Sequence, residues 1–251
     1  MSKLKAVMTA PAGTRFFQLP GLDRPGFVHG FGTIDAGPGL RLARARIRES
    51  FPSVLELATV HQAHGRRAVR VANLDQAVGL RRISADVIAG DLPGVAVAVR
   101  TADCAPILLL DPERRAVAAV HAGWRGTAAE VVEAAVEFLE AEFGSRPERL
   151  FAGIGPCVGP CHYQVDQPVI EGIAAALGKL AGKTLAPDGP GRSRLDLALA
   201  NRLLLERTGV PAKNIQSVGL CTFCHPGFFH SYRREGKGVA SLYHFIARVG
   251  D

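Results

Sequence analysis

Short apolar runs that are rich in β-branched residues recur along the chain, separated by residues typical of turns. Runs of this kind predict β-strands. The predicted strands are Arg15–Leu19, Phe27–Gly32, Leu57–His61, Ala68–Ala72, Ala85–Ala89, Val95–Arg100, Ile107–Leu110, Ala116–His121, Leu150–Ile154, Ile215–Leu220 and Val239–Phe245.

Apolar residues at helical spacing predict a first helix that begins at Thr127. Glu130 follows three residues later, which is the spacing of a capping box. The apolar face continues through Leu139 and Phe143, and Gly144 is placed to end the helix.

Two further helices are predicted towards the carboxyl end of the chain. One runs roughly from Gln167 to Leu180, with Pro168 in its first turn. The other starts near Asp196, a residue suited to an N-cap, and ends before Gly209. Between them, the glycine- and proline-containing segment Lys183–Arg194 is expected to be a mobile surface loop.

Many strands with few helices, in no strict alternation, favour an α+β fold over a doubly wound parallel sheet. The strands are too numerous for one ordinary sheet, so two packed sheets are expected. The 251 residues, 47% of them hydrophobic and 21% charged, are sufficient for a large buried core. One large domain spanning residues 1–251 fits this length, as do two tightly fused lobes.

The net charge of +7 raises the question of an anionic partner. Arginine pairs such as Arg66-Arg67 and Arg233-Arg234 lie far apart, however, and aromatic residues make up only 6% of the chain. We therefore expect a solvated basic surface and no nucleic-acid partner. No apolar segment has the length of a signal peptide core or a membrane span, so we expect a cytoplasmic protein whose five cysteines are reduced.

Three segments place histidine or cysteine where a predicted strand ends. They are ATVHQAHGRR with His61 and His64, TADCAPILLLD with Cys104, and AVAAVHAGWRG with His121. Two imidazoles and one thiolate can bind Zn²⁺ and leave one coordination position open, which is the pattern of catalytic zinc sites. The residues alone leave the choice between His61 and His64 open, although His64 stands before Gly65 in a tight turn.

A second set of cysteines competes for the role of metal ligand. Cys157, Cys161 and His162 lie in one segment, and Cys221, Cys224 and His225 lie in another. These residues are compatible with a structural zinc site, and Cys221–His225 also matches the C-x-x-C-H pattern of haem attachment. We favour a third interpretation, in which they are small packed side chains beside loops of the active site.

Several polar residues are candidates for proton transfer and phosphate binding. Asp103 is adjacent to Cys104, and Asp86 precedes an apolar strand, so either carboxylate is placed to move a proton. His61 is a further catalytic candidate. Arg125 follows His121 closely, and Arg233 follows an aromatic stretch, so both are candidates for binding a phosphate group.

Six ordered segments together resemble the laccase-domain or multicopper polyphenol oxidase family, also called YfiH-like proteins. They are HQAHG, TADCAPILLLD, HAGWRGT, GIGPCVGPCHYQV, LDLALANRLLL and CTFCHPGFFHSYRREG, and they span roughly Gly26 to Ala247. The resemblance implies a four-layer α-β-β-α sandwich of two mixed sheets, similar to the catalytic domain of cytotoxic necrotizing factor toxins. It also implies that His64, Cys104 and His121 bind the metal.

By the same resemblance, the cofactor is Zn²⁺, with Cu²⁺ as an alternative. The implied activity is phosphorolysis of adenosine, inosine and S-methyl-5′-thioadenosine, together with deamination of adenosine. The partners are then a purine nucleoside and phosphate, and the protein is a monomer or a weak homodimer. Two positions depart from the family pattern: Ile34 replaces an arginine, and Val239 replaces the arginine of a Gly-Arg pair. A shifted substrate preference is compatible with these changes.

Other chemistries remain as alternatives. Cys104 as a nucleophile with His121 as its base predicts a cysteine hydrolase or amidase. Copper-dependent oxidation of phenols ranks below it, because a single site with three ligands cannot hold the several coppers of a true laccase.

Overall fold

The computed structural model describes residues 6–250, and within that range the strands form two six-stranded sheets and one three-stranded sheet. The first sheet has the order β1 (Val7–Thr9), β2 (Phe16–Gln18), β3 (Phe27–Gly32), β15 (Leu242–Arg248), β7 (Val95–Thr101) and β4 (Glu56–Ala58). The second has the order β14 (Ile215–Ser217), β10 (Phe151–Ile154), β8 (Ala105–Asp111), β9 (Ala116–Ala122), β6 (Val87–Gly90) and β5 (Ala68–Val71). The small sheet has the order β11 (Gln164–Val165), β13 (Ser193–Leu195) and β12 (Leu185–Pro187).

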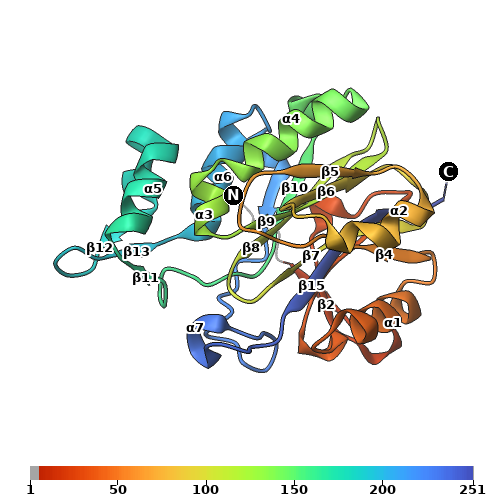
Figure 1. The fold of residues 1–251 in the computed structure, drawn as a ribbon, viewed down its shortest axis with the longest axis horizontal. Helices are drawn as coiled ribbons and strands as arrows, with labels where there is room; N and C mark the ends of the chain where they lie inside the picture. Colours follow the sequence, from red (N-terminus) through yellow and green to blue (C-terminus); the bar gives the residue numbers. More distant parts are fainter. Residues whose placement is uncertain (1–5, 251) are drawn as a thin grey trace.

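Both large sheets are mixed. The first is antiparallel except for the pair β4–β7, and the second is antiparallel except for β10–β14 and β5–β6. Helix α1 (Leu40–Ser50) covers the outer face of the first sheet, and α4 (Val131–Phe143) and α6 (Leu197–Arg207) cover the second (Figure 1). The expected α+β fold with two packed mixed sheets is confirmed.

The layers follow from the alternation of side chains along the strands. In β7, Val97 and Val99 face the core between the two sheets, while Ala96 and Ala98 face α1. In β8, Leu108 faces the core between the sheets, and its neighbours face the helices that cover the second sheet. Strands that are apolar on both faces are therefore covered on both faces, which gives four layers.

The capping box predicted at Thr127 is wrong. Thr127 lies inside the short helix α3 (Trp124–Ala128), where it is buried and its hydroxyl accepts a hydrogen bond of 3.0 Å from Asn201 Nδ2. Glu130 has a left-handed backbone (φ 60°) and separates α3 from α4, and its carboxylate binds Arg207 instead of capping a helix. The predicted end of α4 at Gly144, which is also left-handed (φ 67°), is confirmed.

The later part of the chain agrees better with the sequence. Helix α5 (Gln167–Leu177) begins at the expected residue, and the Asp196 carboxylate caps α6 by accepting a 2.9 Å hydrogen bond from Leu199 N. The segment Lys183–Arg194 is not simply a loop, since it contributes β12 and most of the antiparallel β13. Helices α1, α2 (Leu74–Gly79) and α7 (Tyr232–Glu235) were not predicted.

Among residues 6–250, every helix is too short or too polar to cross a lipid bilayer.

A buried histidine in β3 is hydrogen-bonded to the residue that follows β2. His29 in β3 is 1% exposed, and its Nε2 accepts a hydrogen bond of 2.8 Å from Leu19 N. Burial lowers the pKa of His29 to about 4. The accepting nitrogen must be unprotonated, so folding selects the neutral ring.

His29 should therefore make the protein less stable in acid. Because its pKa is lower in the folded state, its contribution is complete above a pH of about 6.5 and is lost as the pH falls towards 4. The free energy of unfolding in urea should be measured at pH 7.5 and at pH 5.0. Between these two pH values, His29→Gln, which keeps an acceptor oxygen, should lose about 2 kcal/mol less stability than the wild type. The exposed substitution His61→Gln serves as the control, and an equal loss for His29→Gln and the wild type would contradict the assignment.

Candidate functional site

A cavity of about 840 Å³ opens where β7, β8 and β9 meet the loops of the carboxyl-terminal third. Its lining includes His64, Cys104 and His121. Cys104 precedes β8, and the antiparallel register pairs Ala105 with Ala122. Strand pairing therefore brings Cys104 close to His121, although they lie 17 residues apart in the sequence.

Asp86 positions the two histidines. It lies immediately before β6 and is 1% exposed. Its Oδ1 lies 2.7 Å from His121 Nδ1 and accepts a 2.9 Å hydrogen bond from His64 N. Its Oδ2 accepts hydrogen bonds from Gly65 N at 2.7 Å and Ala63 N at 3.2 Å. Burial by itself would raise the pKa of Asp86, but the hydrogen bonds from His121 and these backbone groups lower it overall.

The ligand atoms of His64, Cys104 and His121 all lie within 4.8 Å of one another. The two imidazole rings are 4.7 Å apart between centroids and nearly perpendicular, at 77°. His64 has a left-handed backbone (φ 61°), which the hydrogen bonds to Asp86 hold in place. The three side chains come from three segments, so only the folded chain creates this cluster.

The electrostatics of the cluster favour a thiolate. Burial would raise the pKa of Cys104, but hydrogen bonds from His121 and His64 outweigh it and lower the pKa to about 6. Burial would likewise lower the pKa of His121, but its hydrogen bonds with Asp86 and Cys104 raise it to about 9. A thiolate with two imidazoles is a donor set that suits Zn²⁺ and also Cu²⁺. Since Asp86 engages Nδ1 of His121, the Nε2 atom is left for a ligand.

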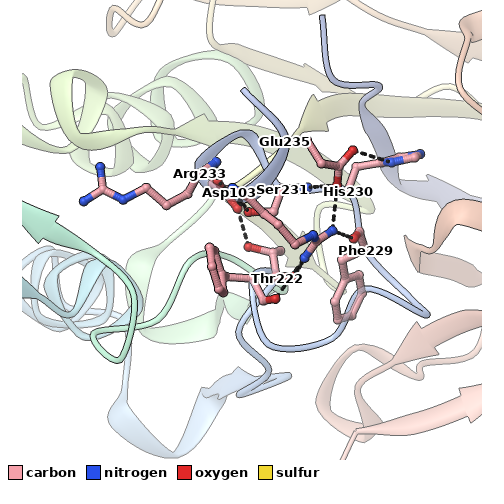
Figure 2. A network of polar contacts seen from close by, with 9 residues as sticks. Asp103, Thr222, Phe229, His230, Ser231, Arg233 and Glu235 are labelled. Atoms are coloured by element: carbon pink, nitrogen blue, oxygen red, sulfur yellow. Dashed lines mark hydrogen bonds and ion pairs between the residues drawn. The ribbon is translucent and has the colours of Figure 1, made fainter. Parts of the chain in front are cut away.

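Asp103 is adjacent to the cluster but its carboxylate is engaged in holding loops together (Figure 2). Its Oδ1 accepts a hydrogen bond of 2.5 Å from the Thr222 hydroxyl. Its Oδ2 accepts bonds from the Ser231 hydroxyl at 3.1 Å and from Arg233 N at 2.6 Å. In this arrangement Asp103 has a scaffolding role, and its role in proton transfer stays a prediction.

The two arginines predicted to bind phosphate differ in their surroundings. Arg125 lines the cavity, with its guanidinium carbon 4.5 Å from the centroid of the Trp124 ring, and among residues 6–250 no acidic group lies within 4.0 Å of it. Arg233 also lines the cavity, but its guanidinium donates hydrogen bonds to the carbonyl oxygens of His162 and Gln164. Arg125 is therefore the better placed of the two to bind an anion.

His61 lines a separate cavity of about 310 Å³, together with Arg81 and Arg82. The structure does not bring its side chain to the cluster of His64, Cys104 and His121.

Sequence reasoning did not identify the role of Asp86 in orienting the histidines, because its partners lie 21 to 35 residues away. It also omitted Tyr163 and Tyr232, which line the large cavity. The only sequence signal for these two tyrosines is their place in the CHY and SYRR segments.

Comparison with known proteins gives consistent results. Residues 29–248 match the family model described as multi-copper polyphenol oxidoreductase laccase. A protein from Deinococcus radiodurans named purine nucleoside phosphorylase is 36% identical, with 95% of this chain and 94% of that protein covered. The adenosine deaminase RL5, from an unknown prokaryotic organism, is 36% identical over 60% of this chain and 57% of its own length. The crystal structure of the Bacillus licheniformis hypothetical protein YfiH superposes with a TM-score of 0.87 at 28% identity, covering 96% of this chain and 98% of that one.

Gly123 lies against two members of the cluster, and a side chain there should disturb it. A Cβ atom at this position would lie 2.8 Å from Cys104 Sγ and 3.2 Å from His64 Cδ2. We expect Gly123→Ala to displace these groups and to weaken zinc binding by on the order of tenfold, measured by competition with a chelator. Gly79→Ala is the matched control, since a Cβ there meets nothing within 4 Å. Equal zinc affinity in both variants would show that the cluster does not hold the metal.

Proposed function

The chain belongs to the multi-copper polyphenol oxidoreductase laccase family, and from this membership we propose that it is a zinc-dependent purine nucleoside phosphorylase that also deaminates adenosine. Its substrates are adenosine, inosine and S-methyl-5′-thioadenosine, with phosphate as the second substrate of phosphorolysis. The observation that carries the proposal is the convergence of His64, Cys104 and His121 in a cavity that also contains Arg125.

The residues fit a zinc ion. Two imidazoles and one thiolate give three ligands, and the low pKa of Cys104 favours the form that binds a metal. When bound, zinc supplies Lewis-acid activation of water and polarisation of an oxygen of the substrate. Asp86 orients His121 for this purpose, and His64 is held through its backbone nitrogen.

The cavity fits a nucleoside. Its volume of about 840 Å³ lies within the usual range of small-molecule sites, which is about 300–1,000 Å³. Trp124, Tyr163 and Tyr232 contribute aromatic surface to its walls, on which a purine ring can pack. Arg125 offers a planar guanidinium that matches two oxygens of a phosphate, and Trp124 supports it from one side.

A cysteine hydrolase is the second candidate, and one observation favours it. Asp86, His121 and Cys104 form a chain in which a carboxylate orients an imidazole and the imidazole contacts a thiol. This is the arrangement of a nucleophilic cysteine with its base. A nucleophile pair has no need of a second imidazole, however, and His64 also hydrogen-bonds Cys104. A metal site, by contrast, accounts for all three side chains.

Product analysis should separate these functions. Protein loaded with saturating zinc should convert adenosine and phosphate to adenine and ribose 1-phosphate, with inosine from deamination, and a chelator should abolish both reactions. Cys104→Ala should be inactive because it removes a ligand. If chelation leaves activity intact while a thiol reagent removes it, the cysteine hydrolase is favoured. If zinc binds but no nucleoside is consumed, the substrate assignment fails.

Arg125 should matter for phosphorolysis more than for deamination, because only phosphorolysis consumes phosphate. Arg125→Gln should raise the KM for phosphate by roughly tenfold or more, consistent with the loss of a charge-assisted contact. The rate of inosine formation without phosphate should change much less. Arg146→Gln serves as the control, since Arg146 does not line the cavity and pairs with Glu148. A parallel loss of both activities would place Arg125 elsewhere than at the phosphate.

A further inference from the structure

Besides the cluster at the large cavity, four other side chains bring metal-binding atoms together. Cys161, His162, Cys221 and Cys224 offer three sulfur atoms and one nitrogen, all within 4.8 Å of one another. Cys161 and His162 lie in the loop that follows β10, and Cys221 and Cys224 lie in the loop that follows β14. Strands β10 and β14 are parallel neighbours, so their loops leave the sheet at the same edge.

Two distances within this cluster match the edges of a tetrahedron around zinc. With a Zn–S bond of about 2.3 Å and a Zn–N bond of about 2.0 Å, the edges are roughly 3.8 Å between sulfurs and 3.5 Å between sulfur and nitrogen. Cys161 Sγ lies 3.6 Å from Cys224 Sγ, and Cys224 Sγ lies 3.3 Å from His162 Nδ1. Two of the six donor pairs thus already have close to the spacing that the metal requires, and the other pairs lie within 4.8 Å.

The surroundings of the cluster also resemble those of a metal site. Cys221 Sγ accepts hydrogen bonds from backbone N–H groups, one of them from Gly159 N at 3.2 Å. The ring of His162 stacks on Phe223 at 3.9 Å between centroids and 15°, which fixes its orientation. Backbone N–H groups around a sulfur and a held imidazole are features of metal ligands that are positioned before the metal binds.

We propose that Cys161, His162, Cys221 and Cys224 form a second, closed zinc site with a structural role. Four protein ligands leave no open position, which distinguishes this site from the three-ligand cluster at the cavity. The earlier preference for small packed side chains is wrong for Cys161 and Cys224, because both are exposed. His225, the histidine of the haem-attachment pattern, is not part of this cluster, and its Nδ1 lies 2.9 Å from the Cys221 carbonyl oxygen.

A metal here would join the loop that lines one wall of the large cavity to the loop that carries Cys221 and Cys224. Thr222, next to Cys221, donates to the Asp103 carboxylate, and the carbonyl oxygen of His162 accepts from Arg233. Val158 and Tyr163, on either side of the Cys161–His162 pair, line the cavity. The second zinc would therefore hold this wall against the segment that carries Cys104, without touching the substrate.

The test is to count metal ions in the full-length protein, purified with zinc under reducing conditions and measured by elemental analysis. Cys104→Ala removes a ligand of the first cluster, so this variant isolates the proposed site and should keep one zinc per chain. Adding Cys161→Ser or Cys224→Ser should reduce the zinc content to near zero. These side chains are exposed, so the substitutions leave no buried void. Cys157→Ala in the same background is the control, because Cys157 lies outside the cluster and should leave the count at one.

Cobalt gives a second readout that is independent of activity. Co²⁺ bound to Cys104→Ala should show the visible bands of tetrahedral coordination and strong sulfur-to-cobalt absorption in the near ultraviolet. Adding Cys161→Ser should remove both signals, because the site no longer holds the metal. The proposal is overturned if Cys104→Ala binds neither zinc nor cobalt, or if mass spectrometry finds Cys161 and Cys224 joined as a disulfide under reducing conditions. Either result would leave the function of the first cluster unaffected.

Discussion

The candidate site depends on one buried carboxylate, that of Asp86. Its two oxygens contact the ring of His121 and three consecutive backbone nitrogens around His64. The loop with His64 connects β4 in the first sheet to β5 in the second, so Asp86 fixes the point where the chain passes between sheets. A buried carboxylate is costly unless its hydrogen bonds are satisfied, and here each bond also positions a member of the cluster. Stability and the geometry of the site are thus supplied by the same contacts.

Asp103, the residue before Cys104, repeats this arrangement. It has a left-handed backbone (φ 90°), and its carboxylate binds groups from residues 222 to 233. The loops of the carboxyl-terminal third therefore depend on a residue adjacent to Cys104 (Figure 2). Both carboxylates beside the cluster accept hydrogen bonds from several donors. The two residues that sequence reasoning placed in proton transfer are, in the structure, those that hold the site together.

The sequence predicts the strands better than the helices, for a physical reason. The central strands are buried on both faces, so continuous apolar runs such as Val95–Arg100 stand out. Helix α1 has arginine at several positions, and only Ala43, Ile47 and Ser50 are buried, so its apolar stripe is too thin to recognise. Glu130 has the spacing of a capping box, but tertiary contacts with Arg207 and a left-handed backbone override this local preference. The segments of the site are visible in the sequence, whereas the contacts between them arise from strand pairing.

The five cysteines show why residue type alone cannot assign chemistry. Cys104 receives hydrogen bonds from two histidines, which lower its pKa and favour a thiolate. Cys157 lies nearby and is buried, but burial and the surrounding negative groups raise its pKa, so it remains a protonated core residue. For Cys161, burial and its neighbouring thiols raise the pKa to about 12. A thiol in this position therefore stays protonated unless a bound cation stabilises its thiolate. Identical side chains therefore differ in their tendency to ionise, and the difference lies in which backbone and imidazole groups the fold places around each sulfur.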